Sequence, residues 1–286
     1  PNRCPDLFQS GGRPEAVVNS TCMYGDKLFI GTDTGLRVLR DAAIVYHIPL
    51  ASPQHIPRYN ALPDETTNNL IKLLDGVRIR SIMRDSSDRL WISTWRSLGL
   101  LRYDHGDLKI FGPEDGLFSD RVRTVVERSD GSFLVACTGG VNVIEGDRVT
   151  ASYGPEVGIG NTDILTVCEG PEGEIFVGTD SDGIYIIGRD GVRQINKESG
   201  LQSGVVMRIK RDRTRDIYWI VTGNSLAWMS PDGQVTTLEH FPYFNNFDLY
   251  ENSRDEMWVL SGNGVYVLSV DDLLEDADLW PIYIGV

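Results

Sequence analysis

The hydrophobic residues of this chain fall into short segments in which apolar and polar positions alternate, with glycine- or aspartate-containing turns between them. Residues 119–128 show the pattern well, because their valines recur among polar residues as in a half-buried β-strand. Asp130-Gly131 is a tight-turn signal, and further strand-like segments follow at 132–137, 141–144 and 148–153. This stretch predicts one sheet of four antiparallel strands.

A short phrase recurs along the chain and shows that this sheet is one of a series. The copies are KLFIGTDTGL (27–36), RLWISTWRSLGL (89–100), SFLVACTGGV (132–141), EIFVGTDSDGI (174–184), IYWIVTGNSL (217–226) and EMWVLSGNGV (256–265). Each contains one hydroxyl or thiol residue, and these markers are Thr32, Thr94, Cys137, Thr179, Thr222 and Ser261, at steps of 62, 43, 42, 43 and 39 residues.

A period near forty residues, built only from short strands, is typical of a β-propeller, in which four-stranded antiparallel blades repeat about one axis. The predicted fold class is therefore all-β, and residues 1–286 are expected to form a single propeller domain. Six blades are recognisable, either as a complete propeller or as part of a seven-bladed ring. The tail 271–286 is expected to give the outer strand of the sixth unit and to lead into a further segment. Residues 1–16 are a candidate closing strand.

Two recurring positions within the phrase have a structural explanation. Large side chains at one equivalent position are expected to pack between blades rather than to form a ring of ligand-stacking aromatics; they are Phe29, Trp91, Phe176, Trp219 and Trp258. The recurring Thr, Ser or Cys is expected to make a structural hydrogen bond. A set of six nucleophiles is disfavoured because the chain has four histidines to activate them.

The long first step of the repeat indicates an insertion at residues 46–76 between blades one and two. Pro63-Asp64-Glu65 resembles a helix start, the leucine- and isoleucine-rich segment 70–74 gives an apolar face, and Gly76 is a stop signal. A short helix or an ordered loop over one face of the propeller is expected. Such an excursion either contributes to a binding surface or covers an edge.

Composition narrows the classes of partner. The chain has 286 residues, 41% of them hydrophobic, and its apolar runs are too short for a transmembrane helix, so no membrane contact by this chain is expected. The net charge of −14 argues against a nucleic-acid partner, because phosphates require a basic surface. Cys137 and Cys168 lie in strand patterns and are expected to be buried, which leaves Cys4 and Cys22 as the plausible disulfide pair.

Catalytic chemistry is weakly indicated. The histidines, His47, His55, His105 and His240, are scattered and lack metal-ligand spacing, so no metal and no cofactor is expected. Asp180 and Asp182 share one turn and could bind a cation or act on a sugar, but acids in a glycine-containing turn more often accept bonds from backbone N–H groups. No catalytic residue is assigned, and the chain is predicted not to be an enzyme.

The predicted binding surface follows from blade geometry. Turns between second and third strands lie on the same propeller face as the connections from a fourth strand to the next blade. Trp95-Arg96 places an aromatic ring and a cation in a turn where other blades have small residues. An exposed tryptophan with amides nearby suits a small polar solute or a sugar, although Trp95 packing on the insertion explains it equally well. The candidate ligand-binding residues are Trp95, Arg96, Asp180, Asp182, Asn161, Asn224, Tyr243 and Asn246.

The repeat resembles the two-component regulator propeller family. RTVVERSDGSFLVACTGGV, LTVCEGPEGEIFVGTDSDGI and GPEDGLFSDRV carry the resemblance, which covers roughly residues 17–270. It implies an extracytoplasmic, periplasmic or extracellular sensor of a membrane-anchored bacterial signalling receptor. The output domain, a histidine kinase or a diguanylate cyclase, would lie outside this chain, which has no kinase or cyclase signature. Apart from the resemblance, a homodimer formed through the parent receptor is considered as a partner.

Three functions remain after this reading. The first is a sensor module that binds a small solute and relays a conformational change. The second is a protein-interaction or dimerisation propeller. The third is a secreted lyase or hydrolase, which the weak catalytic signals disfavour.

Overall fold

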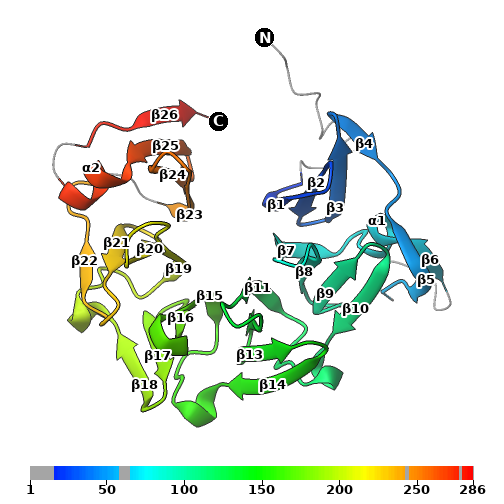
Figure 1. Ribbon diagram of the computed structural model, residues 1–286, viewed down its shortest axis with the longest axis horizontal. Coiled ribbons are helices and arrows are strands. Elements are labelled where there is room, and N and C mark those ends of the chain that lie inside the picture. The colour runs from blue at the N-terminus through cyan, green and yellow to red at the C-terminus, as the bar shows by residue number, and fades with distance from the viewer. Residues whose placement is uncertain (1–15, 58–64, 242–244, 277–278, 286) are drawn as a thin grey trace. The chain divides into compact units, whose positions relative to one another are not determined.

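The fold consists almost entirely of antiparallel β-sheet. The computed structural model describes residues 16–57, 65–241, 245–276 and 279–285, and within these it has six four-stranded sheets and one two-stranded sheet. In each four-stranded sheet the strands follow one another in chain order (Figure 1). The prediction of an all-β propeller with six four-stranded blades is confirmed. The expected closing strand at 1–16 and the residue Cys4 lie outside the described residues, apart from Ala16.

The chain divides into two compact units. The first holds blades 1 and 2 and most of blade 3. Blade 1 is formed by β1 (Val18–Tyr24), β2 (Lys27–Thr32), β3 (Gly35–Arg40) and β4 (Ala43–Val45). Blade 2 is formed by β7 (Arg78–Arg84), β8 (Leu90–Trp95), β9 (Leu100–Asp104) and β10 (Asp107–Phe111). Blade 3 is formed by β11 (Val122–Glu127), β12 (Phe133–Cys137), β13 (Gly140–Glu145) and β14 (Arg148–Tyr153).

The second unit holds blades 4, 5 and 6. Blade 4 is formed by β15 (Ile164–Glu169), β16 (Ile175–Thr179), β17 (Ile184–Gly188) and β18 (Gly191–Ile195). Blade 5 is formed by β19 (Val206–Arg211), β20 (Tyr218–Thr222), β21 (Leu226–Met229) and β22 (Val235–Thr237). Blade 6 is formed by β23 (Asn246–Glu251), β24 (Glu256–Ser261), β25 (Gly264–Ser269) and β26 (Ile282–Gly285). The last strand confirms the prediction that the tail supplies the outer strand of the sixth unit.

One irregularity recurs in every blade. The first strand slips in register by one residue against the second strand near its start, as in β7 between Ile79 and Ser81. Such a β-bulge inserts an extra residue, twists the strand and redirects a side chain. The six inserted residues are Asn19, Arg80, Arg123, Leu165, Met207 and Phe247. They are polar or cationic in the first unit and apolar in the second.

The predicted packing role of the repeated aromatics is confirmed for four of the five. Phe29, Trp91, Phe176 and Trp219 are at most 1% exposed, whereas Trp258 is only partly buried. The two buried tryptophans also have a partner that the sequence pattern did not suggest. The indole N–H of each donates to a buried aspartate from the turn between the first two strands, at 2.8 Å for Trp91–Asp85 and 2.9 Å for Trp219–Asp212.

The repeated hydroxyl residue makes the structural hydrogen bond that was predicted. The hydroxyl groups of Thr32, Thr94, Thr179 and Thr222 donate to a backbone carbonyl across the turn that follows, at 2.8–3.1 Å. Ser261 instead donates to the side chain of Asn246. The thiol of Cys137 is fully buried, as expected for a small apolar side chain.

The connections between blades end as the glycine signals predict. Gly116, Gly158 and Gly200 each close a short 3₁₀ turn with φ near 103° (η1, Pro113–Asp115; η2, Pro155–Val157; η4, Lys197–Ser199). Glycine adopts this left-handed conformation without a steric cost. A further 3₁₀ turn, η3 (Pro171–Gly173), lies between the first two strands of blade 4.

The insertion at 46–76 contains a one-turn helix, α1 (Leu70–Leu73), within the predicted apolar segment. It also contains a hairpin that the sequence did not predict, formed by β5 (Pro49–His55) and β6 (Thr66–Asn69). This hairpin lies beside the outer strands of blade 2 (Figure 1): the N–H of Ala51 donates to the carbonyl of Gly106 at 2.9 Å. The insertion therefore covers an edge of blade 2, the second of the two expected roles. Pro63 and Asp64 lie outside the described residues.

A second unpredicted helix, α2 (Val270–Glu275), precedes the last strand. Ser269 caps its N-terminus by accepting a bond from the N–H of Asp272 at 3.0 Å. Val270 and Leu273 are fully buried in the core of blades 5 and 6. The helix therefore covers an apolar part of these blades.

Candidate ligand-binding site

The turns between second and third strands meet the segments that enter a first strand, as blade geometry requires. In blade 4, the N–H of Asp180 donates to the carbonyl of Asp163 at 3.1 Å. In blade 5, the carbonyl of Gly223 accepts a bond of 3.0 Å from the N–H of Asn245, which leads into blade 6. These backbone bonds place the predicted site residues at one end of their blades.

Trp95 lies at this end of blade 2 and contacts arginines from two first strands. The guanidinium carbon of Arg80 in β7 is 5.0 Å from the centre of the Trp95 ring. That of Arg123 in β11 is 4.3 Å away. Both distances are within the range of cation–π attraction. The described contacts of the Trp95 ring are thus with blades 2 and 3, and the insertion hairpin lies beside the outer strands of blade 2.

The backbone of Trp95 is flanked by two more arginines. Trp95 pairs with Arg78 in the β7–β8 ladder and forms an isolated bridge with Arg121, just before β11. Arg96 follows in the turn with φ of 61° and an exposed side chain. Arg78 forms an ion pair with Asp33 of blade 1, with 2.8 Å between Nε and Oδ1.

Four of these arginines were missed by the sequence analysis, which selected only Trp95 and Arg96 from this region. The sequence feature that could have identified them is a pair of arginines separated by one residue at the start of a first strand. It occurs as RIR (78–80) and as RVR (121–123). Alternate residues of a strand share one face, but the bulges at Arg80 and Arg123 alter that alternation. The pattern of hydrophobic residues does not reveal such a bulge.

A second group of predicted residues comes together in blade 4. The side-chain N–H of Asn161 donates to Ser181 at 2.6 Å, which joins the segment entering β15 to the turn between β16 and β17. In that turn, Asp182 accepts a bond of 3.0 Å from the hydroxyl of Tyr185. Burial and then the nearby Asp182 carboxylate raise the pKa of Tyr185. Asp180 lies in the same turn and is exposed.

The remaining predicted residues are less well placed to meet a solute. Asn224 is exposed, and its side-chain oxygen accepts a bond of 3.3 Å from Thr222. Asn246 is only 1% exposed, and its side chain accepts the bond from Ser261 inside blade 6. Tyr243 lies outside the described residues. The structure thus groups Asn161, Asp180 and Asp182 in the second unit, and Trp95 with Arg96 in the first.

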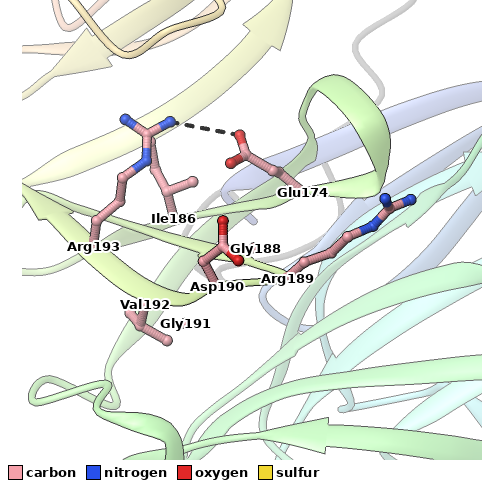
Figure 2. A pocket seen from close by; sticks show the side chains of 8 residues that line it. All are labelled: Glu174, Ile186, Gly188, Arg189, Asp190, Gly191, Val192 and Arg193. Carbon is pink, nitrogen blue, oxygen red and sulfur yellow. Dashed lines mark ion pairs between the residues drawn. The ribbon is translucent and has the colours of Figure 1, made fainter.

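A hollow of about 200 Å³ lies elsewhere in blade 4 (Figure 2). Its walls come from the β17–β18 hairpin and from Glu174 at the start of β16. Arg193 and Glu174 form an ion pair of 3.6 Å across it. This hairpin is at the opposite end of the blade from the turn that carries Asp180, so none of the predicted ligand-binding residues lines the hollow.

Groups suited to acid–base or metal chemistry are dispersed. His105 contacts Asp104 and Tyr24, at 3.0 and 3.2 Å, and His240 lies 3.7 Å from Asp276. In the part of the chain that the structure describes, no group of three or more His, Cys, Asp or Glu side chains is placed to hold a metal ion. Cys22 has a free thiol.

Comparisons with known proteins concern the repeat and the fold. Residues 73–96, which include β7, β8 and Trp95-Arg96, match the family model described as a two component regulator propeller. This segment of the chain therefore matches the two-component regulator propeller repeat. The resemblance found in the sequence is thereby confirmed. No curated protein sequence matches the chain.

Several solved structures share the fold. The extracellular domain assigned to the hybrid two-component system BT3049 of B. thetaiotaomicron matches with a TM-score of 0.72 at 20% identity, over 94% of this chain and 34% of that domain. Virginiamycin B lyase of Staphylococcus aureus matches with a TM-score of 0.64 at 12% identity, over 94% of this chain and 84% of the lyase. PorZ of Porphyromonas gingivalis, a surface component of the type-IX secretion system, matches with a TM-score of 0.59 at 16% identity, over 91% of this chain and 40% of PorZ.

At these identities the likeness establishes the propeller fold. The chain spans between 34% and 49% of the length of the three two-component- or one-component-system domains that it matches. Across the described ranges, no helix has the length and apolar character needed to cross a membrane.

Proposed function

We propose that this two-component regulator propeller is a ligand-sensing module of a membrane-anchored bacterial receptor. It acts on the periplasmic or extracellular side and binds a small polar solute or a sugar. Binding is relayed to an output domain, a histidine kinase or a diguanylate cyclase, elsewhere in the receptor. The support comes from the family repeat and from structural neighbours that are extracellular domains of such systems.

The observation that carries the proposal is the environment of Trp95. Trp95 lies where the second strand of blade 2 meets the turn to the third strand, and it is partly exposed. Its indole ring contacts Arg80 of the first strand of blade 2 and Arg123 of the first strand of blade 3. Aromatic rings and oriented polar groups together fix a small polar molecule through apolar contact and directional hydrogen bonds. A contact that spans two first strands would also link ligand occupancy to the packing of neighbouring blades.

A thermal-shift screen of the whole chain against sugars, amino acids, organic acids and nucleotides tests this function. A ligand that binds only the folded state stabilises it by RT ln(1 + [L]/Kd), so the melting temperature rises with the logarithm of the free ligand concentration once this exceeds Kd. We expect at least one class to produce a concentration-dependent rise that Trp95→Ala abolishes. Tyr46→Ala is the control, because Tyr46 is an exposed aromatic residue next to the insertion hairpin. A rise that persists in Trp95→Ala would contradict the assigned site.

A second candidate, a protein-interaction or dimerisation propeller, is favoured by the outer strand of blade 6. β26 is the last strand of its sheet, and Ile282, Tyr283 and Ile284 are 68%, 53% and 45% exposed. Trp280 just before it is 88% exposed. An exposed apolar edge strand is a template for pairing with another chain. If this function holds, sedimentation will show concentration-dependent association that Ile282→Lys removes, without any ligand-induced thermal shift.

The lyase activity of two structural neighbours is not assigned to this chain. At 12% identity they share the fold alone, and no catalytic residue was assigned from the sequence. A secreted lyase or hydrolase would be favoured only by turnover of a substrate that Asp180→Asn abolishes.

A further inference from the structure

Neighbouring blades pack through two kinds of face. The face that carries the repeated aromatic residue, here called the leading face, packs against the opposite face of the next blade, here called the trailing face. Phe29 packs on blade 2 and Trp91 on blade 3, while Phe176 packs on blade 5 and Trp219 on blade 6, each within one apolar core. Contact between a leading and a trailing face is thus an interface that this chain forms repeatedly.

The leading face of blade 6 is exposed. Trp258 of β24 pairs with Tyr250 of β23 and with Val267 of β25, and Val267 pairs with Ile282 of β26. Paired residues share one face of a sheet, so these four side chains lie together. Tyr250 and Ile282 are 62% and 68% exposed, and Trp258 is partly exposed. Blade 6 therefore leaves open an apolar face of the kind that packs on a further blade.

The trailing face of blade 1 is exposed as well. Leu28 of β2 pairs with Met23 of β1 and with Leu39 of β3, and Leu39 pairs with Ile44 of β4. Met23 and Ile44 are 53% and 47% exposed, and Leu28 is partly exposed. In the other five blades the residue equivalent to Leu28 is at most 4% exposed; these residues are Leu90, Phe133, Ile175, Tyr218 and Met257. At this position the trailing face is open in blade 1 and buried in the later blades.

Charge distinguishes two ways in which a second copy could cover the leading face of blade 6. Residues 245–276 and 279–285, which contain this blade, include eight acidic residues and one basic residue. Residues 16–45, which contain blade 1, include three of each. Arg37 is exposed on the trailing face of blade 1, because it pairs with Ile30. Two copies of blade 6 would repel each other, whereas blade 1 meets blade 6 without that repulsion.

The contact should be looser than an interface within the chain. Leu260 lies two residues after Trp258 and hence on the same face. The other blades have smaller residues at this position, namely Gly31, Ser93, Ala136, Gly178 and Val221. A Cβ on Gly31 would lie 2.5 Å from Ile79 of blade 2, so the following blade approaches closely there. The larger Leu260 side chain, which is 45% exposed, keeps a second copy further away. Association is therefore expected to be reversible.

We propose that this chain associates head to tail, with the leading face of blade 6 in one copy packed on the trailing face of blade 1 in a second copy. Burial of the exposed apolar side chains stabilises the contact. Because the two faces differ, each added copy brings a new open face, so copies can add in series until a ring closes. The inference rests on the second candidate function, an interaction propeller, and names its partner. It does not depend on ligand sensing.

Sedimentation velocity of the full chain at a series of concentrations tests the proposal with two complementary variants. Tyr250→Lys alters the leading face of blade 6 on its first strand, at the opposite side of the sheet from β26. Met23→Lys alters the trailing face of blade 1. Each places an unpaired charge in the contact, so each should weaken association by about tenfold or more. Val157→Lys is the control, because Val157 is an exposed apolar residue of the η2 turn outside both faces; it should associate as the unaltered chain does.

An equimolar mixture of the two variants gives the sharpest result. Tyr250→Lys keeps an unaltered trailing face, and Met23→Lys keeps an unaltered leading face. The mixture should therefore form a dimer and nothing larger, although each variant alone is a monomer. Dimer formation would also show that both variants are folded, and circular dichroism checks this independently.

A mixture that stays monomeric would overturn the inference, as would equal weakening in Val157→Lys. If the unaltered chain is monomeric at every concentration, both the inference and the second candidate function fail, while the sensing function is unaffected. If Met23→Lys associates as strongly as the unaltered chain and Ile282→Lys does not, blade 6 pairs with itself. The interaction function then holds, and only the head-to-tail contact is wrong.

Discussion

In blades 2 and 5, a buried aspartate in the turn between the first two strands accepts a hydrogen bond from a core tryptophan. The Asp85 side chain is fully buried, and it accepts bonds from the indole N–H of Trp91, the backbone N–H groups of Ser87 and Arg89, and the guanidinium of Arg89, all at 2.7–3.0 Å. Burial alone would raise the pKa of Asp85, but these donors outweigh it and lower the pKa. Asp212 has the same arrangement with Trp219.

Replacing Asp85 by Ala should destabilise the protein by roughly 3 kcal/mol, because it leaves the buried indole N–H and two turn N–H groups without their acceptor. Urea denaturation followed by tryptophan fluorescence measures the change. Asp147→Ala is the control, since Asp147 is 66% exposed and pairs with Arg102 at the surface; its effect should be small. Equal effects of the two substitutions would show that the Asp85 network does not stabilise blade 2.

The three described cysteines should differ in reactivity. Burial raises the pKa of both Cys137 and Cys168 to about 12, so neither forms the reactive thiolate at neutral pH. Burial also raises the pKa of Cys22, but this thiol is only partly buried and is therefore accessible to the reagent. Alkylation of the folded protein with iodoacetamide at pH 8, followed by peptide mass spectrometry, should label Cys22 and leave the other two unmodified. Rapid labelling of Cys137 would mean that blade 3 opens far more readily than its packing indicates.

At the level of residues, the sequence predicts packing better than it predicts the site. Phe29 and Trp91 recur at one position of a repeat, so their burial follows from periodicity alone. Trp95 was found because it breaks the repeat. Arg80 and Arg123 were not found. Their contact with Trp95 depends on a register slip between two strands and, for Arg123, on a neighbouring blade. Neither of these features changes the spacing of hydrophobic residues in the sequence.

The turn that carries Trp95 and Arg96 depends on its closing glycine. Gly99 has φ of 67°, and a Cβ atom there would collide with the carbonyl oxygen of Phe111. Its own carbonyl accepts bonds from both the N–H and the hydroxyl of Thr94, each at 2.9 Å. This turn therefore requires both a left-handed conformation and the absence of a side chain.

Gly99→Ala should destabilise the protein more than Gly146→Ala does. Both glycines have positive φ, but a Cβ at Gly146 would have nothing within 4 Å. Gly146→Ala should cost about 1 kcal/mol for the left-handed conformation alone, and Gly99→Ala should cost about 1–2 kcal/mol more because backbone must move. Thermal unfolding measures both. If the two variants melt together, the close approach to Phe111 is not a constraint in solution.

At the level of elements, strands and turns were predictable where alternation and glycine signals coincide, as in residues 119–153. The β5–β6 hairpin was missed because PLASPQH contains two prolines and little alternation, and its pairing depends on contact with blade 2. Helix α2 was missed because VDDLLE is short and looks like the start of a polar tail. Tertiary contact, rather than local preference, determines both elements.

For the whole molecule, stability should fall in acid. Hydrogen bonds and nearby cations lower the pKa of Asp85, Asp115, Asp130, Asp212, Asp248 and Asp255 despite burial. A carboxylate with a lowered pKa contributes stability that is complete above its unfolded pKa, near 4, and is lost as the pH falls through its folded pKa. Glu251 acts in the opposite direction, since burial raises its pKa.

We therefore expect the melting temperature to be nearly constant from pH 7 to about pH 5 and to fall steeply below about pH 4. Differential scanning calorimetry at constant ionic strength measures it, with Asp212→Asn reducing the slope of the acid limb. A melting temperature that rises between pH 5 and pH 3 would contradict the sign of these shifts.

The repeated blade gives six versions of the same bulge, and the residues inserted there vary in chemistry. They are Asn, Arg and Arg in the first unit and Leu, Met and Phe in the second. The same backbone irregularity thus carries an arginine in blades 2 and 3 and an apolar side chain in blades 4 to 6.

Hydrogen–deuterium exchange with and without a solute that raises the melting temperature of the chain tests this account most directly, because it locates the bound solute without relying on any variant. The account predicts slower exchange in residues 78–81, 95–99 and 119–124, with the β17–β18 hairpin and β26 unchanged. Slower exchange confined to the hollow of blade 4, or no change anywhere in the presence of that solute, would contradict the claim that the surface around Trp95 is the ligand-binding site.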